Sequence, residues 1–91
     1  MKKPINRSIP LELNKEHPIL ELDASVSLLQ GSRDIYVDDQ GRQGEMTTGI
    51  LLFSRGEERI ELQFVSGKTF ELWGYSMVVM GEGSWLDLQI R

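Results

Sequence analysis

Few side chains in this chain have the chemistry that catalysis needs. Its 91 residues contain a single histidine, His17, and no cysteine. Nucleophilic catalysis needs a base within hydrogen-bonding reach of a nucleophile, and a zinc site needs three or four His or Cys ligands. His17 stands next to Pro18 in an irregular stretch, so we expect it to be a solvent-exposed linker residue. We therefore assign no catalytic residue, no metal ligand and no cofactor, and we expect no enzymatic activity.

Acidic side chains offer two weaker possibilities. Glu61 and Glu71 are expected on the same side of one hairpin, and two carboxyl groups about 5 Å apart would suit glycoside hydrolysis. A glycine-containing acidic loop could present oxygens to Ca²⁺, although its spacing is not that of an EF-hand. In both cases we favour the interpretation that the charges are solvated. The oxygen-bearing residues of the loop are Asp38, Asp39, Gln40 and Glu45.

An apolar and aromatic face near the C-terminus is the best candidate for a binding surface. Four of its residues alternate along one predicted strand, and a three-residue connection at 81–83 would set Trp85 opposite Val79. Tryptophan and tyrosine are enriched at the centres of protein interfaces. The predicted partner-binding residues are Trp73, Tyr75, Met77, Val79 and Trp85.

Three interpretations of this face stay open. It is half of the core if the protein is a sandwich. It is a pairing surface if it meets another protein or a second copy of the chain. It is the lining of a pocket for a small apolar ligand if the strands close into a barrel.

The elements that position these residues are predicted from period-two alternation. Residues 58–65 and 69–73 read as the two strands of a hairpin, and a three-residue loop at 65–67 or 66–68 sets their apolar residues on one face. Phe64 and Phe70 should then lie on the same side of that ribbon. Gly67 falls where a three-residue hairpin needs a positive φ.

Earlier in the chain, residues 19–28 alternate most cleanly and predict one strand. Gly31 and Ser32 fit a type II′ turn that would begin a second strand at 33–38. Its Ile35 and Val37 would lie on the apolar core face, opposite Leu28 and Val26, and its outward residues Asp34, Tyr36 and Asp38 would be solvated. The polar residues 38–45 predict a loop. The first 18 residues contain three prolines and predict an irregular arm or an edge strand.

Residues 46–54 predict a central strand covered on both faces, because apolar residues follow one another there. An odd connection at 54–56 would pair Ile50 with Ile60, so that Ile50 faces the main core and Leu51 and Phe53 face outward. Gly74 predicts either a bulge or a tight turn, and residues 85–91 predict the last strand.

The predicted fold is all-β: a single-domain antiparallel meander of seven or eight strands closing into a small barrel or a two-layer sandwich, with 1–18 as the arm or edge strand and 19–91 as the β domain. No helical periodicity competes with this pattern. The net charge of −4 argues against nucleic acid, and no apolar run could cross or enter a membrane. We expect a soluble, cytoplasmic protein.

The function expected from these features is non-enzymatic protein binding. An acidic β domain of this size would act as a small inhibitor, an immunity-like protein or an accessory module, and it would recognise a basic protein partner or its own copy as a homodimer. The alternative is a small β-barrel that binds a small apolar ligand. Dye binding by a strict monomer would favour that alternative.

Overall fold

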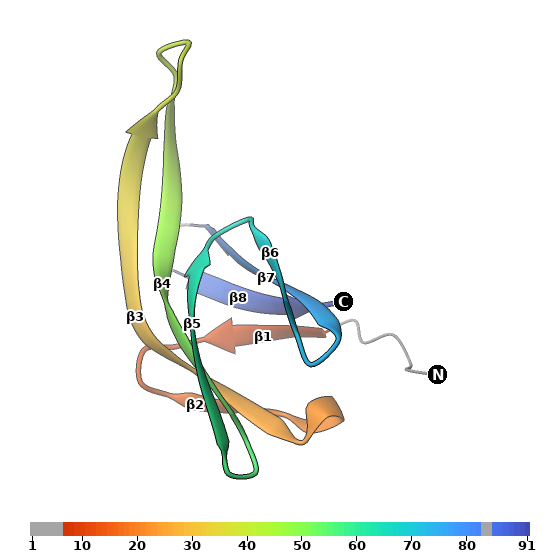
Figure 1. Cartoon of the computed structure of the whole chain (residues 1–91). Coiled ribbons are helices and arrows are strands. Elements are labelled where there is room, and N and C mark those ends of the chain that lie inside the picture. The colour runs from red at the N-terminus through yellow and green to blue at the C-terminus, as the bar shows by residue number, and fades with distance from the viewer. Residues whose placement is uncertain (1–6, 83–84) are drawn as a thin grey trace.

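The computed structural model describes residues 7–82 and 85–91 and shows two antiparallel sheets packed as a sandwich (Figure 1). One sheet has the order β1-β8-β7-β6 and the other β2-β3-β4-β5. The predicted all-β antiparallel class is confirmed, and the two layers form a sandwich and no closed barrel. The elements are β1 (Arg7–Leu11), β2 (Glu16–Ile19), η1 (Leu20–Leu22), β3 (Ala24–Val37), β4 (Gln43–Arg55), β5 (Glu58–Val65), β6 (Thr69–Leu72), β7 (Tyr75–Glu82) and β8 (Trp85–Ile90).

The core lies between the sheets and is built by alternation, since every second residue of a strand points to the same face. None of the described polar or charged side chains is buried in it. The core is therefore stabilised by apolar packing. The fully buried side chains are Phe53, Ile19, Leu51, Met77, Leu88, Ile90, Val26 and Val79.

The predicted hairpin at 58–73 is wrong in its pairing. β5 pairs with β4, and β6 pairs with β7, so the two strands belong to different sheets. Their connection crosses the edge of the sandwich: the Ser66 N–H donates to the Thr47 carbonyl in one sheet, and the Gly67 N–H donates to the Val79 carbonyl in the other. Gly67 has the expected positive φ, 82°. Phe64 and Phe70 both turn toward the core, but from opposite layers.

The predicted turn at Gly31 and Ser32 is also wrong. β3 runs through both residues, and the register with β4 shifts by one residue at a bulge between Leu28 and Gln30. The bulge changes which residues share a face, so Ile35 lies opposite Glu45 instead of Leu28. Upstream, the predicted strand at 19–28 is interrupted by η1 and by Asp23, whose φ is 52°.

β4 is central in its sheet, as predicted, but its two faces are reversed. Leu51 and Phe53 are fully buried, whereas Ile50 is half-buried on the outer face, over which the described part of the chain places no third layer. The cause is the turn to β5, which has two residues, Gly56 and Glu57, instead of three. This turn also lies further along the chain than the predicted one, so the register shifts by three residues, an odd number that exchanges the two faces, and Ile50 pairs with Gln63 and not with Ile60.

The C-terminal strands form as predicted, with a different register. The pair Glu82 and Trp85 closes the β7–β8 hairpin, so Trp85 does not lie opposite Val79. The predicted loop at 81–83 falls partly outside the described residues. Gly74 belongs to a tight turn, the second of the two alternatives, and it shares a positive φ with Trp73 (82° and 54°). β1 is an edge strand next to β8.

Candidate functional site

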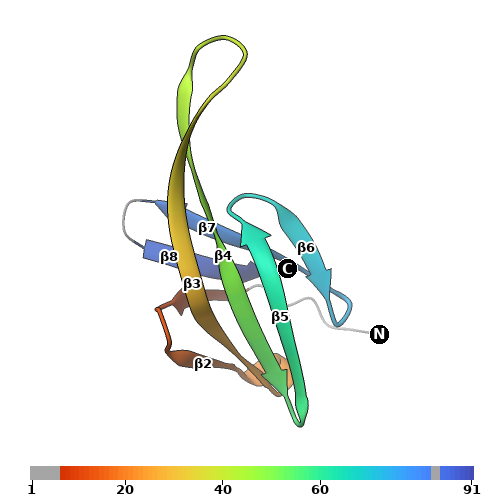
Figure 2. The same cartoon turned by 60° about the vertical axis from the view of Figure 1, so that its left-hand side comes forward.

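A long hairpin made by β3 and β4 stands clear of the sandwich (Figures 1 and 2). β2 pairs with β3 only from Ala24 to Ser27, and β5 reaches β4 only as far as Thr48. β3 has 14 residues and spans roughly 46 Å. The strands that flank the β3–β4 hairpin, β2 with four residues and β5 with eight, are too short to cover that length. Residues 30–47 therefore form a two-stranded ribbon, which we call the arm.

The tip of the arm is held by Asp38. Its Oδ1 accepts hydrogen bonds from the backbone N–H groups of Gln40 and Arg42, both at 2.9 Å, and its Oδ2 accepts one from Arg42 Nε at 3.0 Å. The hydrogen bond from the Arg42 N–H is the main reason that the pKa of Asp38 is lowered. This carboxylate is thus occupied by the loop itself, as in an Asx turn. No group of three or more His, Cys, Asp or Glu that could hold a metal ion occurs among the described residues.

The arm exposes apolar side chains that a monomer would ordinarily bury. Ile35 and Val37, on the face that continues the inner side of the sheet, are 70% and 63% exposed. On the other face Tyr36, which is 46% exposed, lies over Gly44, where an added Cβ would come within 2.5 Å of the tyrosine ring. β-branched and aromatic residues favour a strand. A two-stranded hairpin alone is nevertheless only marginally stable in water.

A groove of about 250 Å³ lies where the arm leaves the sandwich. Leu13, from the β1–β2 connection, and Trp85, at the start of β8, line it and are 59% and 52% exposed. Together with Ile35 and Val37 they make four large apolar side chains that are more than half exposed. We call these four residues and the groove the arm surface. The groove is lined by Leu13, Leu28, Gly31, Ser32, Arg33, Thr47, Trp85 and Leu86.

The predicted partner-binding residues do not form one exposed face. Met77 and Val79 are fully buried between the sheets, which is the sandwich-core interpretation, and they cannot touch a partner unless the sandwich opens. Tyr75 is half-buried against the core. Trp85 alone of the five is mainly exposed and lies on the arm surface.

Trp73 is half-buried and joins the two sheets at the opposite end of the core from the arm. Its Nε1 donates to Glu58 Oε1 at 3.2 Å, and its ring meets Phe53 edge-on with centroids 6.0 Å apart. The Arg55 guanidinium lies 5.2 Å from the centre of the indole ring, within cation–π range. These contacts hold the residue in a left-handed conformation that is costly for a bulky side chain. Its role in the structure is to connect the layers.

Two candidates for chemistry are placed differently from the prediction. His17 is not a linker residue: it lies in β2 opposite Val26, is half-buried, and its Nε2 is enclosed with no hydrogen-bond partner among the described residues. Glu61 and Glu71 lie in different sheets and are both exposed, each next to inward-facing apolar residues of its strand. They therefore point away from each other on opposite sides of the sandwich and cannot form a catalytic pair.

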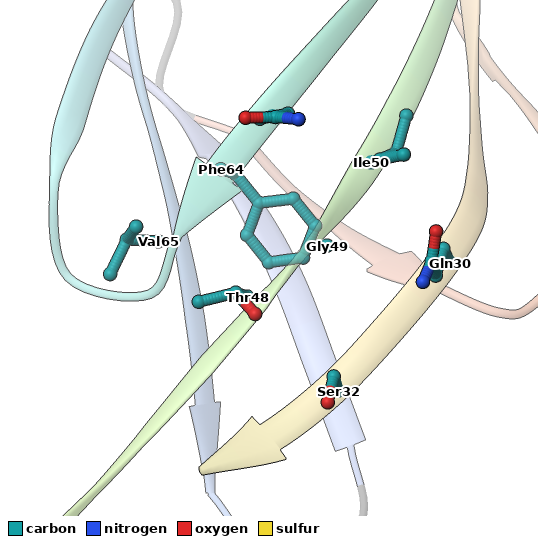
Figure 3. A pocket seen from close by; sticks show the side chains of 8 residues that line it. Gln30, Ser32, Thr48, Gly49, Ile50, Phe64 and Val65 are labelled. Carbon is teal, nitrogen blue, oxygen red and sulfur yellow. The ribbon is translucent and has the colours of Figure 1, made fainter. Parts of the chain in front are cut away.

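A second hollow, of about 440 Å³, lies on the outer face of the sheet at the base of the arm (Figure 3). Its lining contains no charged side chain, so no residue there can act as an acid or a base at neutral pH. Two glutamines and two hydroxyl groups surround an apolar floor. The lining residues are Gln30, Ser32, Thr48, Gly49, Ile50, Gln63, Phe64 and Val65.

The alternation pattern did not identify the arm. It predicted Ile35 and Val37 as core residues and Tyr36 as solvated. A hairpin centred on the 38–42 loop pairs Val37 with Gln43 and Ile35 with Glu45. Pairs of an apolar and a polar residue indicate a ribbon with no buried face. This mismatch is the feature of the sequence from which the arm could have been identified.

Comparisons of the chain with protein-family models, with curated proteins and with solved structures found no match. Within residues 7–82 and 85–91, no helix has the length and apolarity needed to cross a bilayer. The function must therefore be argued from the arm, the grooves and the distribution of charge.

Proposed function

We propose that this protein is a non-enzymatic binding module that engages a protein partner through the arm surface. The observation that carries the proposal is the exposure of Ile35 and Val37 on a ribbon that no other described segment covers, beside the exposed Leu13 and Trp85. Fully burying one large apolar side chain contributes roughly 1.5–3 kcal/mol, so covering the exposed parts of these four would contribute roughly 4–7 kcal/mol before the costs of association.

Charge supports a basic partner. The chain carries 14 acidic and 10 basic side chains, and the arm has more acidic than basic residues. A negative surface speeds encounter with a positive one and repels further copies of itself. The module would act by occupying or escorting a basic protein, in the manner of a small inhibitor or immunity-like protein. Binding should weaken as salt is added.

The test compares full-length bait proteins in quantitative affinity purification. We expect a specific basic partner to be retained by the wild type and lost, by at least tenfold, from the double variant Ile35→Ser/Val37→Ser, because about tenfold corresponds to only 1.4 kcal/mol. Leu20→Ser is the matched control, since Leu20 is 75% exposed but lies in η1, away from the arm. Equal loss in the control variant, or no loss in the double variant, contradicts the proposal.

A second experiment distinguishes a protein partner from a second copy of the chain. Analytical ultracentrifugation of the wild type at micromolar concentration should show a monomer if the arm surface is made for another protein. A dimer that the double variant abolishes would assign the surface to a homodimer instead.

A small uncharged ligand is the second candidate function. The sandwich has no barrel lumen, so the apolar-ligand interpretation depends on the outer hollow, whose 440 Å³ falls within the range of ligand sites. A hydrophobic dye that binds the wild type in a one-to-one ratio, and that the Ile50→Gln variant no longer binds, would support this candidate. Dye binding that Ile50→Gln leaves unchanged would remove it.

A further inference from the structure

The edges of the two sheets differ in how well they are protected against pairing with another strand. An exposed edge offers unpaired backbone groups to any extended chain, and proteins block such edges with proline, charge or short strands. β1 contains Pro10, β2 contains Pro18, and β6 has only four residues. β5 carries charged side chains at Glu58, Arg59 and Glu61.

The edge of β3 within the arm is less protected, since its only charged side chains over residues 30–37 are the neighbours Arg33 and Asp34. Upstream it is covered by the chain's own backbone, since Leu13 bridges to Leu28 and the Asn14 N–H donates to the Leu28 carbonyl at 2.8 Å. Beyond the bulge, residues 30–37 have no strand beside them on this side among the described residues. This segment has no proline and ends in three consecutive β-favouring residues, Ile35, Tyr36 and Val37.

The direction of the backbone groups along this edge follows from the hydrogen bonds at the tip. The Asp38 N–H donates to the Arg42 carbonyl, so residue 38 points its backbone toward β4. Backbone direction alternates along an antiparallel strand. Gly31, Arg33, Ile35 and Val37 therefore point their N–H and C=O groups to the free edge.

The residue opposite Arg33 agrees with this alternation. Thr47 turns both backbone groups away from β3: its N–H donates to Ser66 Oγ at 3.0 Å, and its carbonyl accepts from the Ser66 N–H at 2.8 Å. The arm edge of β4 is correspondingly shorter, because Ser66 ends it at Thr47. The β3 edge is the longer of the two.

Charge on the arm selects the kind of strand that would add there. Asp38 and Arg42 pair with each other, which leaves Asp34, Asp39 and Glu45 against the single cation Arg33. A strand with basic residues on the face of Asp34 and apolar residues on the face of Ile35 and Val37 would complement both sides. A second copy would instead bring two negative arms together.

We propose that the arm edge of β3, residues 30–37, accepts an extended basic segment of a partner protein as an added β-strand. This inference rests on the proposed function and names the form of the partner. Strand addition supplies affinity through main-chain hydrogen bonds and specificity through alternate side chains. It would also turn the two-stranded arm into a three-stranded sheet, which is the smallest unit expected to be independently stable.

The test uses the full-length, ¹⁵N-labelled protein and a capped heptapeptide of alternating lysine and valine, with a glutamate–valine heptapeptide as control. With the basic peptide at about ten times its dissociation constant, exchange of the Arg33, Ile35 and Val37 amides should slow roughly tenfold. The Asp34 and Tyr36 amides, which already face β4, should change little. The acidic peptide should give no protection.

Two substitutions at one position separate backbone pairing from side-chain docking. Ile35→Pro removes an N–H that faces the free edge, so the fold should tolerate it, as edge strands tolerate proline, while peptide binding falls at least tenfold. Ile35→Thr loses the same apolar side chain but keeps the N–H and the strand propensity, so it should bind the peptide several-fold more tightly than Ile35→Pro does. Thermal denaturation of both variants checks that they fold.

Each contrary result has a distinct meaning. If the peptide shifts the Trp85 indole resonance but leaves the three edge amides unprotected, or if Ile35→Pro binds as the wild type does, strand addition is overturned and the arm surface survives as a docking site. If the same amides become protected with rising protein concentration and no peptide, a second copy occupies the edge and the basic-partner inference is overturned. If neither peptide produces any change at the arm, strand addition is overturned. The proposed function is then decided separately, by whether the Ile35→Ser/Val37→Ser variant loses the captured partner.

Discussion

The substitution Gly49→Ala should destabilise the protein at the base of the arm. A Cβ at residue 49 would lie 2.1 Å from the Gln30 carbonyl oxygen and 2.8 Å from Phe64 Cε1. The ring can turn, but the carbonyl belongs to the bulge and moves only with the backbone of β3. Overpacking of this kind costs about 1–3 kcal/mol, and the backbone contact places this site near 3. Thermal unfolding should shift down by roughly 15 °C in a domain of this size.

Gly31→Ala is the matched control, because Gly31 lies directly opposite Gly49 in the same ladder. Its added Cβ would meet only Leu28 Cδ2, at an ordinary 3.9 Å. We expect no loss of stability, or a gain of up to about 1 kcal/mol, since alanine in a strand restricts the unfolded chain more than glycine does. Urea unfolding of the two variants measures the difference. Equal stability of Gly49→Ala and the wild type would refute the close approach of β3 and β4 at the bulge.

Three further outcomes are expected. Deleting the last six residues removes most of β8, on which both β1 and β7 depend, so the cooperative unfolding transition and the β-type circular dichroism should disappear; a truncated protein that keeps both would contradict the sheet order. The lowered pKa of Asp38 means that its ionised form is favoured in the folded state, so Asp38→Ala should destabilise the arm tip at neutral pH, and the difference from the wild type should shrink as the pH falls through that lowered pKa; a difference in amide exchange at Gln40 and Arg42 that does not change with pH would count against hydrogen bonds to an ionised Asp38. His17→Leu removes an enclosed nitrogen without a partner among the described residues and should raise the unfolding free energy by about 1 kcal/mol, as measured in urea, whereas a decrease would show that the imidazole is satisfied.

The turns were the weakest part of the prediction from sequence. The Gly56–Glu57 turn is shorter than expected and lies further along the chain, and the resulting odd shift in register exchanged the buried and outer faces of β4. The bulge after Leu28 lies within one long strand, β3, that replaces the two short strands predicted there. Neither feature changes composition or alternation enough to be visible, because one extra or missing residue alters only the register.

The partner-binding face shows the same limit for a site. Tyr75, Met77 and Val79 lie on one face of β7 as expected, whereas Trp73 lies in the turn before it. An apolar face reads identically whether it is covered by the other sheet or by another protein. Here the other sheet covers it. Trp85 is exposed because it lies at one end of its strand, where the covering layer stops.

The amino-acid sequence by itself determined the class of the protein and the orientation of many side chains. Alternation reports which side of its strand a residue occupies, so Phe64, Phe70, Leu88 and Ile90 could be assigned to a buried side without knowledge of the fold. Tertiary structure alone decided which strands pair and where covering layers end. Backbone hydrogen-bonding groups are the same at every residue, so the choice between a hairpin and a crossing to the second sheet depends on packing of the whole chain. The arm surface exists because β2 and β5 end before β3 and β4 do.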